Sequence, residues 1–293
     1  MYAAKIVAVA WLILVAASTS AQPSNPPDPV FPSDSTNPQQ TGGRDLLEAV
    51  CPGEVVNGDE IECREGCPDF TSFGSIGDRF RWSLQAVTRG HFLSATSEDA
   101  VLWMTGCEPH SENFGGTALV TRRAERWTML WYKAGVQTEK CHKVPLRNGR
   151  EILICIATAG AQGISVTELY VEDLLDPKAV LMAAEASSFF AARDTVGSCG
   201  WNQEDEQKPY PLIRSRIEKV EFSSDKASGV SVITIAASYG KRTMNPEDVR
   251  ACLANRDKVA PLTRRYRMRF VFNGYDYSPV PSSANSVRLF EDR

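Results

Sequence analysis

The chain has 293 residues, of which 43% are hydrophobic, so it can bury a sizeable core. Its 32 basic and 36 acidic side chains give a net charge of −4. Proteins whose main partner is a nucleic acid or an anionic membrane usually carry an overall positive excess, so this composition argues against both classes of partner.

The first 21 residues have the pattern of a secretory signal peptide. Lys5 precedes an apolar run over residues 6–17, and the small residues Thr19 and Ala21 fit a signal-peptidase site. This run is shorter than the roughly 20 residues that a membrane-spanning helix needs. There is also no Asn-x-Ser/Thr glycosylation signal. We therefore expect a secreted or periplasmic bacterial protein without an integral membrane segment after signal cleavage.

The next stretch, residues 22–44, is rich in proline, serine, asparagine and glutamine and holds few apolar side chains. Such a stretch cannot bury enough surface to offset the entropy lost on ordering. We expect a disordered spacer here, with the folded part beginning near Asp45.

The eight cysteines all follow the spacer, and an even number in an exported chain predicts disulfides. Cys199 and Cys252 are remote from the others in sequence and are expected to pair. Cys141 and Cys155 flank a predicted Asn148-Gly149 turn, and a hairpin can place two cysteines opposite each other. Two further disulfides would then come from the remaining four cysteines, which are Cys51, Cys63, Cys67 and Cys107.

Most of the folded part consists of short strand-like runs separated by turn residues. Apolar and polar side chains alternate over residues 80–86, and again near the C-terminus, where aromatic residues and Met268 alternate with arginines. Many short strands at such spacing indicate an all-β, mainly antiparallel fold, either a sandwich or a propeller-like array. We divide it into an N-terminal half, residues 45–175, and a C-terminal half, residues 176–293.

One short helix is strongly signalled near residues 246–254. Asn245 is a suitable N-cap, Pro246 suits the first helical position, and two acids follow in the first turn. Residues 177–192 are ambiguous, because their alanines favour a helix while the surrounding sequence also fits a hairpin that turns at residues 175–178. We prefer the hairpin.

The segment GCEPHSENFGG, residues 106–116, concentrates polar groups within a few positions. In an extended chain the side chains of Glu108, His110 and Glu112 point the same way, because side chains alternate along a strand. With Asn113 as a further oxygen donor, these groups could bind a ligand or hold a divalent metal.

The same segment also suits a rigid loop that bridges two strands. Pro109 restricts its backbone, the glycine pair tolerates unusual dihedral angles, and an oxidised Cys107 cannot act as a thiolate ligand. We therefore predict no metal and no cofactor. Because functional groups tend to lie on loops held by rigid scaffolds, we place the ligand contacts on Glu108, His110, Glu112 and Asn113.

The outer side of the last predicted strand carries a basic stripe made of Arg264, Arg265, Arg267 and Arg269. Such a stripe could bind an anionic polymer. Charged side chains on an exposed strand also prevent aggregation between sheet edges, and we prefer that interpretation.

Two stretches run from a turn into an apolar strand and on to a glycine: RGHFLSATSEDAVLWMTG and LRNGREILICIATAGAQG. They resemble FG-GAP repeats, the integrin-α-like repeats of β-propellers, over residues 89–172. The resemblance implies a glycine-containing turn that leads into a strand. FG-GAP repeats often carry an aspartate-rich calcium loop, but here residues 147–150 read Arg-Asn-Gly-Arg, so calcium binding at that turn is not implied.

Common catalytic signatures, such as Gly-x-Ser-x-Gly, His-Glu-x-x-His and the Walker A loop, do not occur in the sequence. The leading prediction is a non-catalytic, secreted or periplasmic binding or scaffold module. Two alternatives stay open. One is a secreted, metal-assisted hydrolase centred on Glu108, His110 and Glu112, and the other is a structural envelope protein.

Overall fold

A computed structural model describes most of the chain between residues 28 and 291, namely residues 28–40, 42–50, 55–56, 62–63, 82–105, 115–161, 163–175, 188–199, 211–224, 230–255, 259, 261–274 and 276–291. The predicted all-β class is confirmed, since antiparallel strands dominate these ranges. None of the helices in them is long and apolar enough to span a bilayer.

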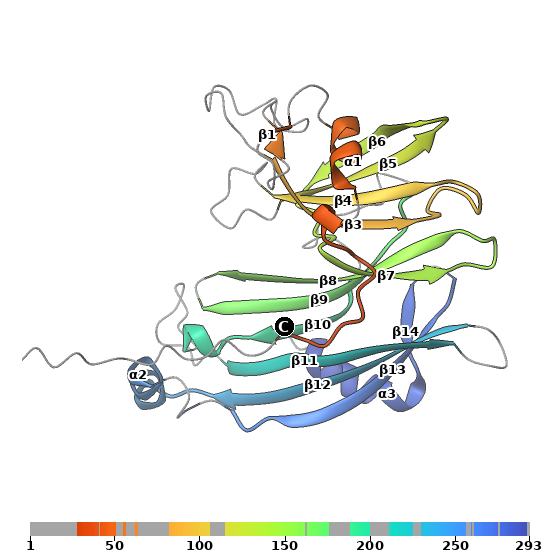
Figure 1. Ribbon diagram of the computed structural model, residues 1–293. Coiled ribbons are helices and arrows are strands. Elements are labelled where there is room, and N and C mark those ends of the chain that lie inside the picture. The colour runs from red at the N-terminus through yellow and green to blue at the C-terminus, as the bar shows by residue number, and fades with distance from the viewer. Residues whose placement is uncertain are drawn as a thin grey trace, which may run out of the picture.

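The strands form two antiparallel sheets (Figure 1). The six-stranded sheet follows the chain order and contains β1 (Val55–Val56), β2 (Glu62–Cys63), β3 (Trp82–Gly90), β4 (Asp99–Thr105), β5 (Gly116–Arg123) and β6 (Arg126–Ala134). The eight-stranded sheet, also in chain order, contains β7 (Lys140–Pro145), β8 (Glu151–Ala161), β9 (Ile164–Glu172), β10 (Ser188–Asp194), β11 (Pro211–Ser224), β12 (Ser231–Thr243), β13 (Arg264–Phe272) and β14 (Tyr277–Pro279). The chain changes sheet between Ala134 and Lys140, earlier than the predicted division near residue 175.

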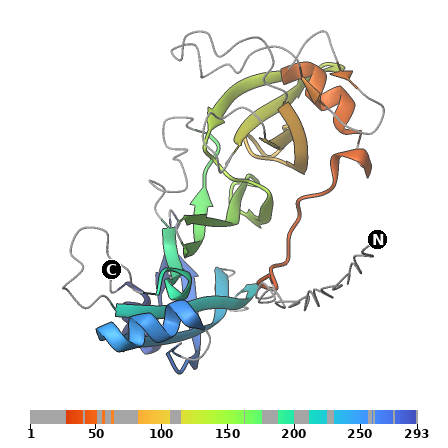
Figure 2. The same cartoon turned by 90° about the vertical axis from the view of Figure 1, so that its left-hand side faces the viewer.

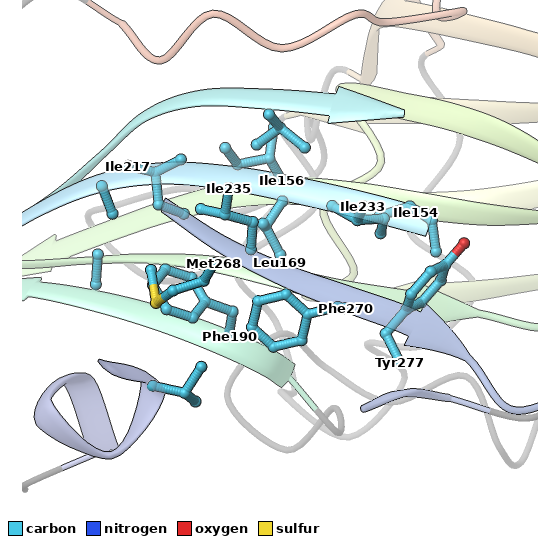
Figure 3. Close-up of a cluster of buried hydrophobic side chains, with 14 of the residues drawn as sticks. Ile154, Ile156, Leu169, Phe190, Ile217, Ile233, Ile235, Met268, Phe270 and Tyr277 are labelled. Atoms are coloured by element: carbon cyan, nitrogen blue, oxygen red, sulfur yellow. The ribbon is translucent and has the colours of Figure 1, made fainter. Parts of the chain in front are cut away.

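The eight-stranded sheet folds over between β10 and β11, which pair only at Asp194 and Arg214. Strands β7–β10 therefore pack face to face on strands β11–β14, and the six-stranded sheet forms a third layer above them (Figures 1 and 2). The largest core fills the space inside the folded sheet (Figure 3) and includes Ile154, Ile156, Leu169 and Phe190 from one layer and Ile217, Ile233, Ile235, Met268 and Phe270 from the other.

Strand β8 lies in the middle layer and is buried on both faces. Ile154 points into the core of the folded sheet, whereas Leu153 and Cys155 point toward the six-stranded sheet. This double burial explains why residues 151–157, EILICIA, read as a nearly continuous apolar run instead of an alternating one. A further core lies on the far side of the six-stranded sheet, under α1 (Gly43–Val50).

The helix predicted near residues 246–254 is confirmed as α2 (Pro246–Ala254), and the Asn245 side chain accepts a hydrogen bond of 2.8 Å from the Asp248 amide. Helices α1 and α3 (Pro281–Glu291) were not predicted. Helix α3 packs Val287 and Phe290 against the core of the folded sheet. Residues 188–192 of the ambiguous segment belong to β10, while residues 176–187, with most of the predicted turn, lie outside the described residues.

The N-terminal segment, residues 28–37, runs along the side of all three layers (Figure 2) and is called the strap below. Val30 exchanges backbone hydrogen bonds with β11, the Asp34 amide donates to Cys141 of β7 at 2.7 Å, and Thr36 bonds Val87 of β3. The expectation of a disordered spacer is therefore wrong for these residues. Backbone hydrogen bonds to three strands offset the ordering entropy, and composition does not reveal them.

Both disulfides predicted individually are confirmed. Cys141 and Cys155 are directly opposite each other on β7 and β8, and Cys199 joins Cys252 of α2 across 53 residues. Of the remaining four cysteines, only the backbone of Cys63, in β2, lies within the described residues; Cys51, Cys67 and Cys107 lie outside them.

Candidate functional site

The predicted ligand residues Glu108, His110, Glu112 and Asn113 lie outside the described residues, in the connection between β4 and β5. The structure does describe the two strand ends that carry this connection. Gly115 has a φ of +70°, and a Cβ on Gly116 would collide with the ring and hydroxyl of Tyr132. The glycine pair of the motif is therefore required by backbone conformation and by close packing.

A buried carboxyl lies between the two sheets, near the start of β5 and the end of β6. Glu172, at the end of β9, is 1% exposed, and its Oε1 atom has no hydrogen-bond partner among the described residues. Burial raises the pKa of Glu172 to about 8, although the charge of Lys133 on β6 acts in the opposite direction. The carboxyl is therefore neutral at pH 7, but its enclosure keeps it from any substrate in this conformation.

The two histidines within the described residues lie in separate places, and each one contacts another segment of the chain. His91 lies in the connection from β3 to β4, where its Nδ1 is 2.5 Å from the carbonyl of Ser97. His142 on β7 stacks on Phe222 and places its Nδ1 3.0 Å from Asp34 of the strap. Burial lowers the pKa of His142, and the attraction of Asp34 only partly opposes this. In the part of the chain that the structure describes, no three His, Cys, Asp or Glu side chains gather closely enough to hold a metal ion.

An open hollow of about 500 Å³ lies beside the strap, against β3 and the start of β7. Its hydroxyl groups already take part in the attachment of the strap. Thr36 Oγ1 donates to the Val87 carbonyl at 3.0 Å, and the hydroxyls of Ser35 and Thr88 are 2.9 Å apart. The hollow therefore offers few unused polar groups to a ligand.

The outer side of strands β11–β13, away from the core of the folded sheet, carries the most distinctive arrangement of charge. Along β12 the inward residues Ile233, Ile235 and Ala237 are buried, so Thr234, Ala236 and Ser238 face outward. This outward row contains only small side chains.

Basic side chains flank that row on both sides. Cross-strand pairing places Arg269 beside Thr234, Arg267 beside Ala236 and Arg265 beside Ser238. On the other side, Lys219 pairs with Ala236 and Arg216 with Ser238. We call the following six residues the basic face: Arg214, Arg216, Lys219, Arg265, Arg267 and Arg269.

Carboxylates from β10 and β11 contact part of the basic face. Arg265 Nε lies 3.3 Å from Glu218, and Arg267 lies 2.7 Å from Glu221, although their side chains stay 85% and 71% exposed. Arg216 contacts Asp194 at 3.0 Å. Arg269 is exposed and has no acidic partner among the described residues. Among the described residues, six basic groups therefore face three carboxylates, and the net charge of these groups is positive.

Sequence reasoning identified only the β13 part of this face. Lys219 faces the same side as Arg214 and Arg216 only because β11 carries a β-bulge between Ile217 and Lys219. The bulge shifts the alternation of side chains by one residue. The arginine alternation in residues 264–269 was the available signal, but it does not show that a second basic row lies across β12.

Comparisons of the chain with protein-family models, with curated proteins and with solved structures find no match, and the likeness to FG-GAP repeats accordingly stays a prediction.

Proposed function

We propose that the protein is a secreted or periplasmic, non-catalytic module that binds an anionic ligand on the basic face. The observation that carries the proposal is the double row of basic side chains on β11 and β13. The chain as a whole has a net charge of −4, so this concentration of positive charge is local.

The framework beneath the basic face is rigid. Its inward side packs on the largest core, and the Cys199–Cys252 disulfide fixes α2 beside the start of β11. The backbone that carries the binding groups therefore needs no reordering when a ligand arrives. The two disulfides also agree with an oxidising compartment outside the cytoplasm.

The ion pairs on the face do not prevent binding. Exposed pairs such as Arg265–Glu218 and Arg267–Glu221 contribute little to stability, because water screens them. A ligand with several anionic groups can therefore displace these carboxylates and contact several arginines at once.

Retention on a negatively charged resin tests this proposal. At pH 7.5 and low salt the mature chain should bind a sulfonate resin despite its pI of about 5.6, and the R265Q/R267Q/R269Q variant should elute earlier. A matched control, R122Q/R123Q/R126Q, removes three exposed arginines from the β5–β6 hairpin. Equal loss in both variants, or no retention of the unmodified chain, would contradict a binding role for the basic face.

The hydrolase alternative keeps its predicted centre at Glu108, His110 and Glu112. It requires a metal, so native mass spectrometry of the mature chain separates it from the proposal. One stoichiometric zinc or calcium ion that is lost in His110→Ala would favour the hydrolase over the binding module.

A further inference from the structure

We infer that the ligand of the basic face is a linear acidic polysaccharide whose chain lies along β12, between the two basic rows. This inference rests on the proposed function and adds the chemical class of the ligand. It follows from the width of the face, from the groups on its floor and from the positions of the aromatic residues.

The two basic rows define a track about one polymer chain wide. Neighbouring strands lie roughly 4.8 Å apart, so the rows on β11 and β13 are about 10 Å apart, with β12 between them. Alternate arginines on β13 repeat about every 6.7 Å along the strand. Long side chains thus flank a floor of small ones, Thr234, Ala236 and Ser238.

The groups on the track suit carboxylated or sulfated sugars. Arginine presents a planar fork that binds carboxylate or sulfate through two parallel hydrogen bonds. On the floor, the hydroxyls of Thr234 and Ser238 have no hydrogen-bond partner among the described residues. Thr234 is partly exposed, so its hydroxyl can donate to, or accept from, the hydroxyls of a sugar ring, whereas Ser238 is only 8% exposed and forms a buried part of the floor.

The positions of the aromatic residues argue against single-stranded nucleic acid. Proteins that bind such strands stack bases on aromatic rings. Here Tyr239, Tyr266 and Phe270 all point inward, where Tyr239 and Tyr266 contact Phe290 of α3 and Phe270 contacts Phe190 of β10. None of the outward positions of β11–β13 that flank or form the track is aromatic.

The centre of the face also lacks the apolar groups that peripheral membrane proteins insert into a bilayer. The exposed Leu262 lies at one end of the track, where its segment packs against Gly240, the next outward position after Ser238. A bilayer would meet arginines and small polar residues at the centre, so the face fits a hydrated polymer better.

Glu218 and Glu221 would act as internal competitors for the ligand. Their carboxylates reach from β11 to arginines on β13 and so cross the β12 row. An incoming carboxylate or sulfate must displace them before it can contact Arg265 and Arg267. Replacing both glutamates by glutamine should therefore strengthen binding.

Isothermal titration of the full mature chain with polygalacturonate tests the inference, with dextran as the uncharged control. Binding should weaken with added salt, fall at least tenfold in R265Q/R267Q/R269Q and rise a few-fold in E218Q/E221Q. The R122Q/R123Q/R126Q variant should bind like the unmodified chain. Thr234→Val should weaken polygalacturonate binding but leave retention on the sulfonate resin unchanged.

Further arms use oligo-dT, polyglutamate and phosphatidylglycerol vesicles. If one of these binds through the basic face while polygalacturonate does not, the ligand class is wrong and the proposed function stands. If no polyanion binds, or if the R265Q/R267Q/R269Q variant binds every ligand normally, both fail. Equal affinity for polygalacturonate and oligo-dT would also overturn the inference, because charge alone would then explain binding.

Discussion

Strands β8 and β13 belong to the same sheet but have opposite surroundings. Strand β8 lies in the middle layer, and every side chain from Ile152 to Ala157 is buried. Strand β13 lies in an outer layer, where buried Met268 and Phe270 alternate with the exposed Arg267 and Arg269. A continuous apolar run therefore marks a strand between two other layers, and alternation marks a strand with one face in water. Only the second kind can carry a binding surface without disturbing a core.

The largest expected effect of a substitution concerns the middle strand, β8. Leu153→Ala and Ile154→Ala remove adjacent side chains that are fully buried in different cores. Each should lower the free energy of unfolding by about 2–5 kcal/mol. Arg267→Ala on β13 should change it by less than about 0.5 kcal/mol. Urea denaturation of the three variants measures this, and a small effect at either β8 position would contradict burial on both faces.

The same two layers can be compared through their disulfides. Cys199–Cys252 encloses 53 residues of the outer layer and its helix, whereas Cys141–Cys155 encloses 14 residues of a hairpin whose strands are already paired. Replacing either pair by alanine should cost about 2–4 kcal/mol, with the larger loss for Cys199–Cys252, because the longer loop gains more entropy on unfolding. Denaturation without reductant would show this order, and the reverse order would mean that strain or burial outweighs loop entropy.

Glu172 is buried between the middle layer and the six-stranded sheet, and its titration makes the stability of the folded protein depend on pH. Its pKa is about 8 in the folded protein, against an ordinary value of about 4.3. Between these values the folded state holds a proton that the unfolded state has released, so stability falls as pH rises. The fall is at most about 1.4 kcal/mol per pH unit from this group.

Glu172→Gln keeps the shape of the neutral carboxyl and removes its titration. Thermal or urea unfolding between pH 5 and pH 8 should therefore show a flatter profile in this variant, and greater stability than the unmodified chain at pH 8. Glu168→Gln on the same strand is a suitable control, because Glu168 is only half-buried. Identical slopes in Glu172→Gln and the unmodified chain would mean that Glu172 does not carry the proton.

Local patterns in the sequence predicted the parts of the fold that depend on neighbours in the chain. The Asn245-Pro246 signal located α2, and the Asn148-Gly149 turn placed Cys141 opposite Cys155. Features that depend on distant partners were not predicted. The strap is ordered only by strands that come later in the chain, and its composition resembles that of a disordered segment.

The candidate site shows the same limit. The alternation of arginines on β13 is visible in the sequence, but its position across β12 from Arg216 and Lys219 depends on the register of three strands and on the bulge in β11. Residues 108–113, which the sequence favoured for their chemistry, lie outside the described residues. Clusters of reactive residue types are therefore easy to find, whereas surfaces assembled from several strands require the structure.

The smallest predicted effect concerns the strap, which connects the middle layer to the two other layers through hydrogen bonds. Burial lowers the pKa of His142, with Lys143 adding to the shift and Asp34 opposing it. Below the ordinary value of about 6.5 the unfolded state therefore takes up a proton more readily than the folded one. The stability that neutral His142 contributes is complete above pH 6.5 and falls as the pH drops below it.

Amide hydrogen exchange at Lys143 reports directly on the contact between β7 and the strap, because that amide donates to Asp34 of the strap at 2.7 Å. Relative to the amide of Leu153, its protection should fall between pH 7 and pH 5.5, and His142→Gln should abolish the fall. The Glu172→Gln background is the right one for this measurement, since Glu172 changes global stability with the opposite slope over the same range. Unchanged relative protection would show that protonated His142 keeps its contact with Asp34, in which case the ion pair compensates for the desolvation of the ring.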